Sequence, residues 1–194
     1  MAMRKVLILM LWVVGMTAMA EEHLTFTGIP IDGPLDCFSQ ALEQQDFRRL
    51  RVFNNPVFEG LFADRLAYVI VETTPETHVV CEVLVAFQKL HQWNELDSAY
   101  NALKAKLIAQ YGEPAETKEV GEGPQEITQV RQYLEDAILI RRCKFVTELG
   151  TIDLAMDNLR LHELSRGVPY VYLIYTDKAN INTAAQEGMM VCNN

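Results

Sequence analysis

Residues 78–114 read HVVCEVLVAFQKLHQWNELDSAYNALKAKLIAQYGEP, and this stretch decides the fold. Its first ten residues alternate apolar side chains with others, as a strand with one buried face does. From Trp93 onward apolar residues recur every three or four positions, which predicts an amphipathic helix that ends at Gly112 and Pro114. The stripe on this helix consists of Trp93, Leu96, Tyr100, Leu103, Leu107 and Tyr111. A strand followed by such a helix predicts a sheet with the stripe packed across it.

The residues before this stretch predict one helix and a run of strands. An Asp-Gly-Pro turn at 32–34 precedes a helix over about 34–45, whose first turn holds a proline and an acidic residue, both favoured there. Strand-like runs begin at Arg49, Val57 and Arg65 and are separated by short turns. Because parallel neighbours need long crossovers, these short connections predict an antiparallel meander.

The residues after it contain the same kinds of element. Residues 113–126 are polar and acidic with glycines and a proline, which predicts an exposed, irregular connection. A short helical pattern from Ile127 is followed by three strand-like runs, the last of them from Pro169, and by a weak helix over about 178–186. Runs of strands interrupted by single helices predict an α+β fold. We expect a mainly antiparallel sheet of about six or seven strands, with two or three helices packed on one face.

The first twenty residues have the layout of a secretory signal peptide. Arg4 and Lys5 precede a short apolar run, and Ala18 and Ala20 supply the small side chains of a cleavage site. The run is too short to span a bilayer comfortably, which disfavours the alternative of an uncut membrane anchor. We expect cleavage after Ala20 and a periplasmic or secreted protein, not inserted in the membrane. Residues 21–194 then have the size of a single α+β domain.

The mature domain is acidic. Cleavage removes two basic residues and no acidic one, so the formal charge of the chain changes from −9 to −11. An acidic surface repels phosphate backbones and anionic lipids, which argues against nucleic acid and membrane surfaces as partners. The stretches at about 24–112 and 127–187 each end with an apolar strand followed by a helix. Two similar halves joined by an acidic linker are therefore a second interpretation of the domain.

Local motifs for catalysis are missing from the sequence. No segment matches a phosphate-binding glycine loop, a GxSxG elbow, an HExxH metal pair or a CxxC redox pair. The four histidines have no metal-like spacing, and we expect neither a metal nor a cofactor. Asp153 and Asp157 share one face of a strand but lie about 13 Å apart along it, too far for a glycosidase pair. A hydrolase site would have to be assembled from distant residues.

The four cysteines are the reactive side chains of interest. Cys37 lies in the first turns of the predicted helix at 34–45, on the side away from its apolar face. Cys81 and Cys143 lie on the apolar faces of their strands, either as buried thiols or as a bridge across the sheet. In an exported protein an even number of cysteines favours disulfides over a free nucleophile, but four cysteines allow three pairings. We prefer Cys37 with Cys192, which would fix the tail, and Cys81 with Cys143.

Two tyrosines provide a candidate binding surface. In PYVYLIY, Tyr170 and Tyr172 point to one face of the strand, and Val171, Leu173 and Tyr175 point to the other. Apolar residues on both faces are typical of a covered central strand. If no helix covers the first face, its tyrosines form a rigid, amphipathic contact surface for a partner.

Several segments also carry a family resemblance. They are FTGIPIDGPLDCFSQAL, VFEGLFADRLAYVIV, VAFQKLHQWNELDSAYNALKAKLIAQYGEP, RRCKFVTEL and YVYLIYTDKAN, which together span about 26–180. In these segments the chain resembles a family of short, secreted, uncharacterised proteins of Bacteroides-type gut bacteria. The resemblance implies secretion and brings no activity or catalytic motif. We therefore expect a non-enzymatic module that binds a protein or another macromolecule, with an inhibitor as one form of it and a hydrolase as the alternative.

Overall fold

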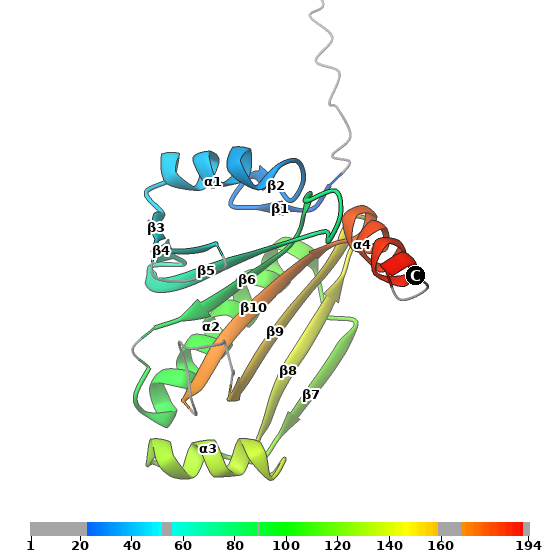
Figure 1. The fold of residues 1–194 in the computed structure, drawn as a ribbon. Coiled ribbons are helices and arrows are strands. Elements are labelled where there is room, and N and C mark those ends of the chain that lie inside the picture. Colours follow the sequence, from blue (N-terminus) through cyan, green and yellow to red (C-terminus); the bar gives the residue numbers. More distant parts are fainter. Residues whose placement is uncertain (1–22, 52–55, 89, 159–167, 192–194) are drawn as a thin grey trace, which may run out of the picture.

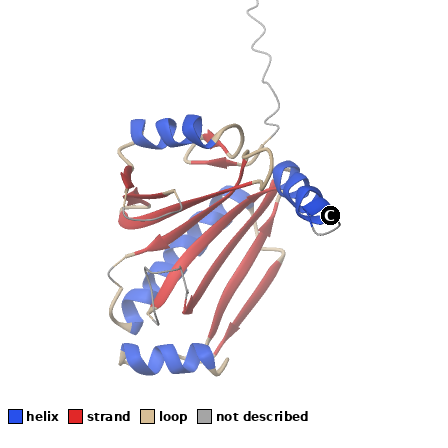
Figure 2. Ribbon diagram, viewed as in Figure 1, coloured by secondary structure: helices blue, strands red, loops and turns tan. Residues whose placement is uncertain are grey.

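The computed structural model of the chain describes residues 23–51, 56–88, 90–158 and 168–191. They form an eight-stranded sheet, a two-stranded hairpin and four helices (Figures 1 and 2), and none of these helices has the length and apolar composition needed to cross a membrane. The helices are α1 (Leu35–Gln44), α2 (Trp93–Tyr111), α3 (Ile127–Glu135) and α4 (Lys178–Val191). The strands are β1 (Thr25–Phe26), β2 (Ile29–Pro30), β3 (Arg48–Leu50), β4 (Val57–Phe62), β5 (Arg65–Thr73), β6 (Val80–Phe87), β7 (Glu116–Val120), β8 (Ile140–Val146), β9 (Gly150–Asn158) and β10 (Pro169–Asp177).

The large sheet is antiparallel throughout, which confirms the predicted α+β class. Its strand order is β3-β4-β5-β6-β10-β9-β8-β7. The first and second parts of the chain therefore contribute four strands each and meet where β6 pairs with β10. Duplication of one half from the other stays a prediction.

The sheet has more strands than predicted because β7 lies in the stretch expected to be an irregular connection. All five of its residues are exposed, and β7 is joined to β8 from Glu116 opposite Lys144 to Val120 opposite Ile140. A polar strand at the edge of a sheet can form through main-chain hydrogen bonds without burying an apolar side chain. Such a strand leaves no alternation of apolar residues in the sequence.

The apolar stripe of α2 packs on one face of the sheet, as its periodicity predicts. The helix begins at Trp93 and ends at Tyr111, and Gly112 follows with φ 82°, in the left-handed region that glycine favours. Four residues of the stripe are buried, namely Leu96, Tyr100, Leu103 and Leu107. They join a core that includes the row Val85, Leu173 and Leu154 on three adjacent strands. This core covers one face of the sheet, and a smaller cluster around Tyr172 lies on the other.

Segments from both ends of the chain meet at one end of the sheet (Figure 1). Pro34, just before α1, bridges to Val79, and the amide of Val80 donates to the carbonyl of Gly33 at 2.9 Å. The helix α4 contacts β6, β9 and β10. The same end of the sheet therefore holds the N-terminal hairpin, the start of α1 and the start of α4.

Candidate functional site

The sheet face opposite α2 carries the tyrosines selected from the sequence. The register places Tyr172 on β10 between Ala86 on β6 and Ala155 on β9. Tyr68 on β5 lies on the other side of Ala86. Ala86 and Ala155 are 0% and 2% exposed, so the larger side chains around them fill the space that these small residues leave. We call the set Tyr68, Leu84, Tyr170, Tyr172 and Ile174 the tyrosine face.

The tyrosine face is partly buried. Tyr172 is 6% exposed and clusters with Ala86 and Ala155, whereas the other four members of the face are half-buried. Burial raises the pKa of the Tyr172 hydroxyl, and the nearby Arg142 guanidinium opposes that shift. The sequence left open whether these tyrosines belong to the core or to a binding surface. Tyr172 is a core residue, whereas Tyr170 keeps part of its side chain accessible to a partner.

Charged side chains border the tyrosine face on both sides. On the β4–β6 side the register aligns three acidic residues with this face, namely Glu59, Glu72 and Glu82. On the β8–β7 side it aligns three basic residues, namely Arg142, Lys144 and Lys118. The Lys144 ammonium lies 3.6 Å from a carboxylate oxygen of Asp153. Asp153, Asp157 and Glu116 share this face on the same side, so the face has an apolar and aromatic centre, an acidic border on β4–β6 and a border of mixed charge toward β7.

A second cluster of titratable groups lies where β10 ends and α4 begins. Asp177 is fully buried, and its carboxylate accepts hydrogen bonds from the amides of Leu24 at 2.9 Å and Asn180 at 3.0 Å. His23 Nδ1 lies 3.2 Å from Asp177 Oδ1, and His23 Nε2 lies 3.6 Å from Asp32 Oδ2. No local pattern in the sequence signals this cluster, because its members come from both ends of the chain.

The contacts of Asp177 join the N-terminal segment to the start of α4, and we call this set of contacts the structural clamp. A histidine between two carboxylates resembles the base and orienting group of a hydrolase. A cysteine nucleophile, however, needs a lowered pKa. Burial, together with Glu82, Glu72 and Asp177, raises the pKa of the Cys81 thiol to about 11. The hydrolase alternative therefore gains a histidine and carboxylates in contact, but the Cys81 thiol is not activated as a nucleophile.

The structure corrects one of the two expected disulfides. Cys37 is exposed on α1, whereas Cys81 and Cys143 are buried, and no disulfide joins any two of these three. Two strands, β10 and β9, lie between β6 and β8, so the Cα atoms of Cys81 and Cys143 are at least about 14 Å apart at the usual strand spacing. A disulfide needs Cα atoms within about 7 Å, so the expected Cys81–Cys143 bridge is wrong. Cys192 lies outside the described residues, and its pairing with Cys37 stays a prediction.

Thiol titration checks the remaining pair. In folded protein that has not been reduced, we expect no thiol to react quickly with Ellman's reagent and two to react after denaturation, because Cys81 and Cys143 are buried. Cys192→Ser should release Cys37, which is exposed, and add one fast-reacting thiol. A fast-reacting thiol in the unaltered protein would contradict the Cys37–Cys192 bridge.

Asp153 and Asp157, the other candidate residues, form contacts within the sheet. Asp153 pairs with Lys144, and Asp157 accepts the amide hydrogen of Asn158 at 2.7 Å. Within the four described ranges, no three histidine, cysteine, aspartate or glutamate side chains are grouped so as to hold a metal ion. Asp153 and Asp157 are both half-buried, which is consistent with the view that they are acids at the surface of the sheet and not a catalytic pair.

A hollow of about 410 Å³ lies between α3 and the start of β10. It is lined by His91, Ile127, Thr128, Arg131, Gln132, Glu135, Val168 and Pro169. Arg131 and Glu135 in its wall pair with each other at 2.9 Å and so neutralise the charges that would attract an ionic ligand. The tyrosine face, with its aromatic and aliphatic centre, is therefore the better candidate surface.

Comparisons with known proteins do not identify a relative. No family model, no curated protein and no solved structure matches the chain. The resemblance to secreted proteins of gut bacteria thus stays an expectation from the sequence, and function has to be inferred from the surfaces described above.

Proposed function

We propose that the chain is an exported, non-enzymatic binding module that engages a protein partner through the tyrosine face. The observation that carries this proposal is the group of half-buried Tyr68, Leu84, Tyr170 and Ile174 around the nearly buried Tyr172. Tyrosine and aliphatic side chains that keep part of their surface in water, with charged residues at the border, have the composition of a protein interface.

The packing of the face provides a rigid platform. Tyr172 fills the centre of the row and packs with the buried Ala86 and Ala155 on either side, which holds its ring in place. Interface residues that are already held in place lose little conformational entropy on binding. The half-buried tyrosines are thus suited to act as anchors that need little rearrangement.

The chemistry of the face favours a protein partner. Leu84 and Ile174 lie opposite each other on β6 and β10 and present aliphatic surface, which packs against apolar side chains of another protein. The charged borders then fix the orientation of the partner, because like charges brought together across an interface are unfavourable. The partner should therefore present an apolar segment flanked by charges of both signs.

Affinity capture followed by measured binding tests the proposal. Residues 21–194 carrying an affinity tag are incubated with the envelope and medium of the producing organism, and any captured protein is purified. We expect the double substitution Leu84→Ala/Tyr170→Ala to weaken its binding at least about 30-fold, the effect of losing a hot spot of about 2 kcal/mol.

The matched control is Ile138→Ala, which shortens a half-exposed aliphatic residue outside the tyrosine face. We expect this control to change the dissociation constant less than about twofold, and circular dichroism should show that all variants are folded. A captured protein that binds the double variant as tightly as the unaltered chain would rule out the tyrosine face as its site.

A further inference from the structure

The outer side of β7 has no neighbouring strand among the described residues. β7 is the last strand in the sheet order (Figure 1), and all five of its residues are exposed. An edge strand presents unpaired main-chain N–H and C=O groups that can pair with another strand. β3 at the opposite edge has three residues, so β7 is the longer of the two edges.

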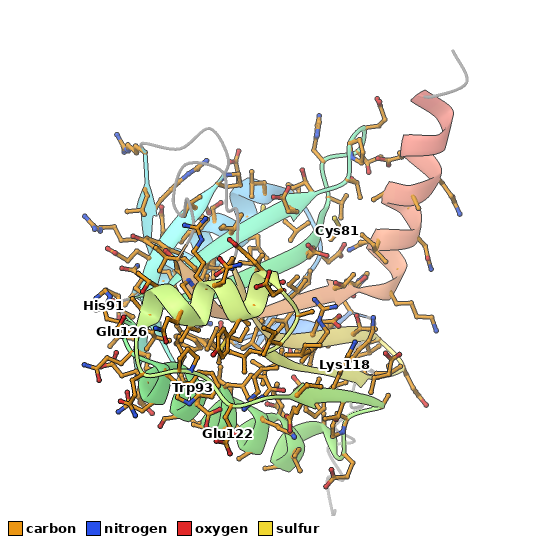
Figure 3. All side chains as sticks on the ribbon, turned by 90° about the horizontal axis from the view of Figure 1, so that it is seen from below. Cys81, His91, Trp93, Lys118, Glu122 and Glu126 are labelled. Atoms are coloured by element: carbon orange, nitrogen blue, oxygen red, sulfur yellow. The ribbon has the colours of Figure 1, made fainter. Side chains whose placement is uncertain are left out.

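Glu116 and Lys118 on this edge have no charged partner within ion-pair distance among the described residues, although Glu116 lies opposite Lys144 on β8. Within the described part of the chain neither forms an ion pair or a side-chain hydrogen bond, whereas Glu119 on the other face of β7 accepts hydrogen bonds from Tyr100 at 2.9 Å and Lys104 at 2.7 Å. Lys118 lies at the margin of the sheet (Figure 3), directly opposite Arg142 on β8. Like charges in directly opposed positions are unfavourable. A carboxylate on the free side of Lys118 would relieve this repulsion.

We propose that β7 pairs antiparallel with β7 of a second copy of this chain, with Thr117 opposite Thr117 at the twofold axis. In this register Glu116 of each copy lies opposite Lys118 of the other, so two complementary charge pairs form on one face of the joined sheet. Val120, which is 45% exposed, comes opposite Pro114 of the second copy. Opposed charge pairs and opposed threonines both stabilise adjacent strands.

The neighbouring registers are unfavourable, which makes the pairing specific. An axis at Lys118 places the two lysines opposite each other, and an axis at Glu119 does the same to the two glutamates. Only the axis at Thr117 sets both Glu116 side chains against lysines. Each mature copy is predicted to carry a charge near −11, but this repulsion is screened beyond about 8 Å at physiological ionic strength. The result is a twofold dimer with one continuous sheet.

Charge reversal tests the proposal by sedimentation analysis. We expect residues 21–194 to form dimers, and Lys118→Glu or Glu116→Lys each to weaken dimerisation at least about tenfold, because each puts two like pairs in place of two complementary ones. The double variant Glu116→Lys/Lys118→Glu should restore dimers, since the pairs reform with exchanged signs. An equimolar mixture of the two single variants should form mixed dimers for the same reason.

Disulfide trapping tests the register separately. In a chain with Cys37→Ser, Cys192→Ser and Cys143→Ala, the last because Cys143 lies directly opposite position 117 on β8, Thr117→Cys should crosslink to itself under mild oxidation. Opposed residues of antiparallel strands have Cα atoms about 4.5–5.5 Å apart. The control Val120→Cys should not crosslink, since position 120 faces position 114 in this register. A monomer at all concentrations, single reversals that dimerise like the unaltered chain, or equal crosslinking at 117 and 120 would overturn the proposal.

Discussion

Asp177→Ala is expected to lower the free energy of unfolding by about 3 kcal/mol. Asp177 directly precedes α4, and its carboxylate accepts the amide hydrogen of Asn180 in the first turn of that helix, so alanine removes a cap with a typical value of about 1 kcal/mol. It also leaves the buried amide of Leu24 without an acceptor, which costs about 1–3 kcal/mol. The N-terminal hairpin and α4 should loosen together, because this one side chain holds both.

Two variants separate these contributions in urea denaturation. Asp177→Asn keeps an oxygen for the helix cap but turns an N–H group toward the amide of Leu24. We therefore expect its free energy of unfolding to lie between those of the wild type and Asp177→Ala. His23→Ala removes the contact with the imidazole and leaves both amide hydrogen bonds, so its effect should be the smallest of the three. If Asp177→Ala lost less than about 1 kcal/mol, the clamp would not be a major source of stability.

Gly150→Ala is the second large effect we expect, at about 3 kcal/mol. Gly150 is buried at the start of β9, directly opposite Asp177 on β10. A Cβ added at this position would overlap the carbonyl oxygen of Thr176, which belongs to the main chain of β10. Because the obstacle is backbone, β9 and β10 have to separate, and overpacking of this kind costs about 1–3 kcal/mol or more.

Gly60→Ala is the matched control for this substitution. Its added Cβ would meet the ring of Phe47, a side chain that can turn aside at a lower cost than a strand can move. In thermal unfolding, we therefore expect Gly150→Ala to have a lower midpoint temperature than Gly60→Ala. Equal midpoints, or the reverse order, would contradict the assignment of Gly150 to a close approach between strands.

The sequence predicted those elements whose apolar residues recur with a clear period. The helix α2 has the predicted bounds, and β10 begins at Pro169 as predicted. The helix α4 was predicted to end near 186 but continues to Val191. A periodic stripe records one buried face, and it can be recognised without knowledge of the element that covers it. The α+β class and the antiparallel sheet followed from these stripes and from the short turns between them.

The candidate surfaces were predictable only in part. The alternation in PYVYLIY placed Tyr170 and Tyr172 on one face, but the burial of Tyr172 depends on Ala86 and Ala155 on the neighbouring strands. The expected bridge between Cys81 and Cys143 failed for a similar reason. Both side chains were correctly expected to be buried, but the order of the strands, which sets their separation, is not encoded in either strand alone.

By itself, then, the sequence determined the elements with apolar periods, the acidic charge and the expectation of export. The tertiary structure decided which strands are neighbours, that Glu116–Val120 forms an edge strand, and that Asp177 joins the N-terminal hairpin to α4. These features depend on main-chain pairing and on contacts between residues far apart in the chain. Such interactions carry no local period, so they become visible only when the whole chain is folded.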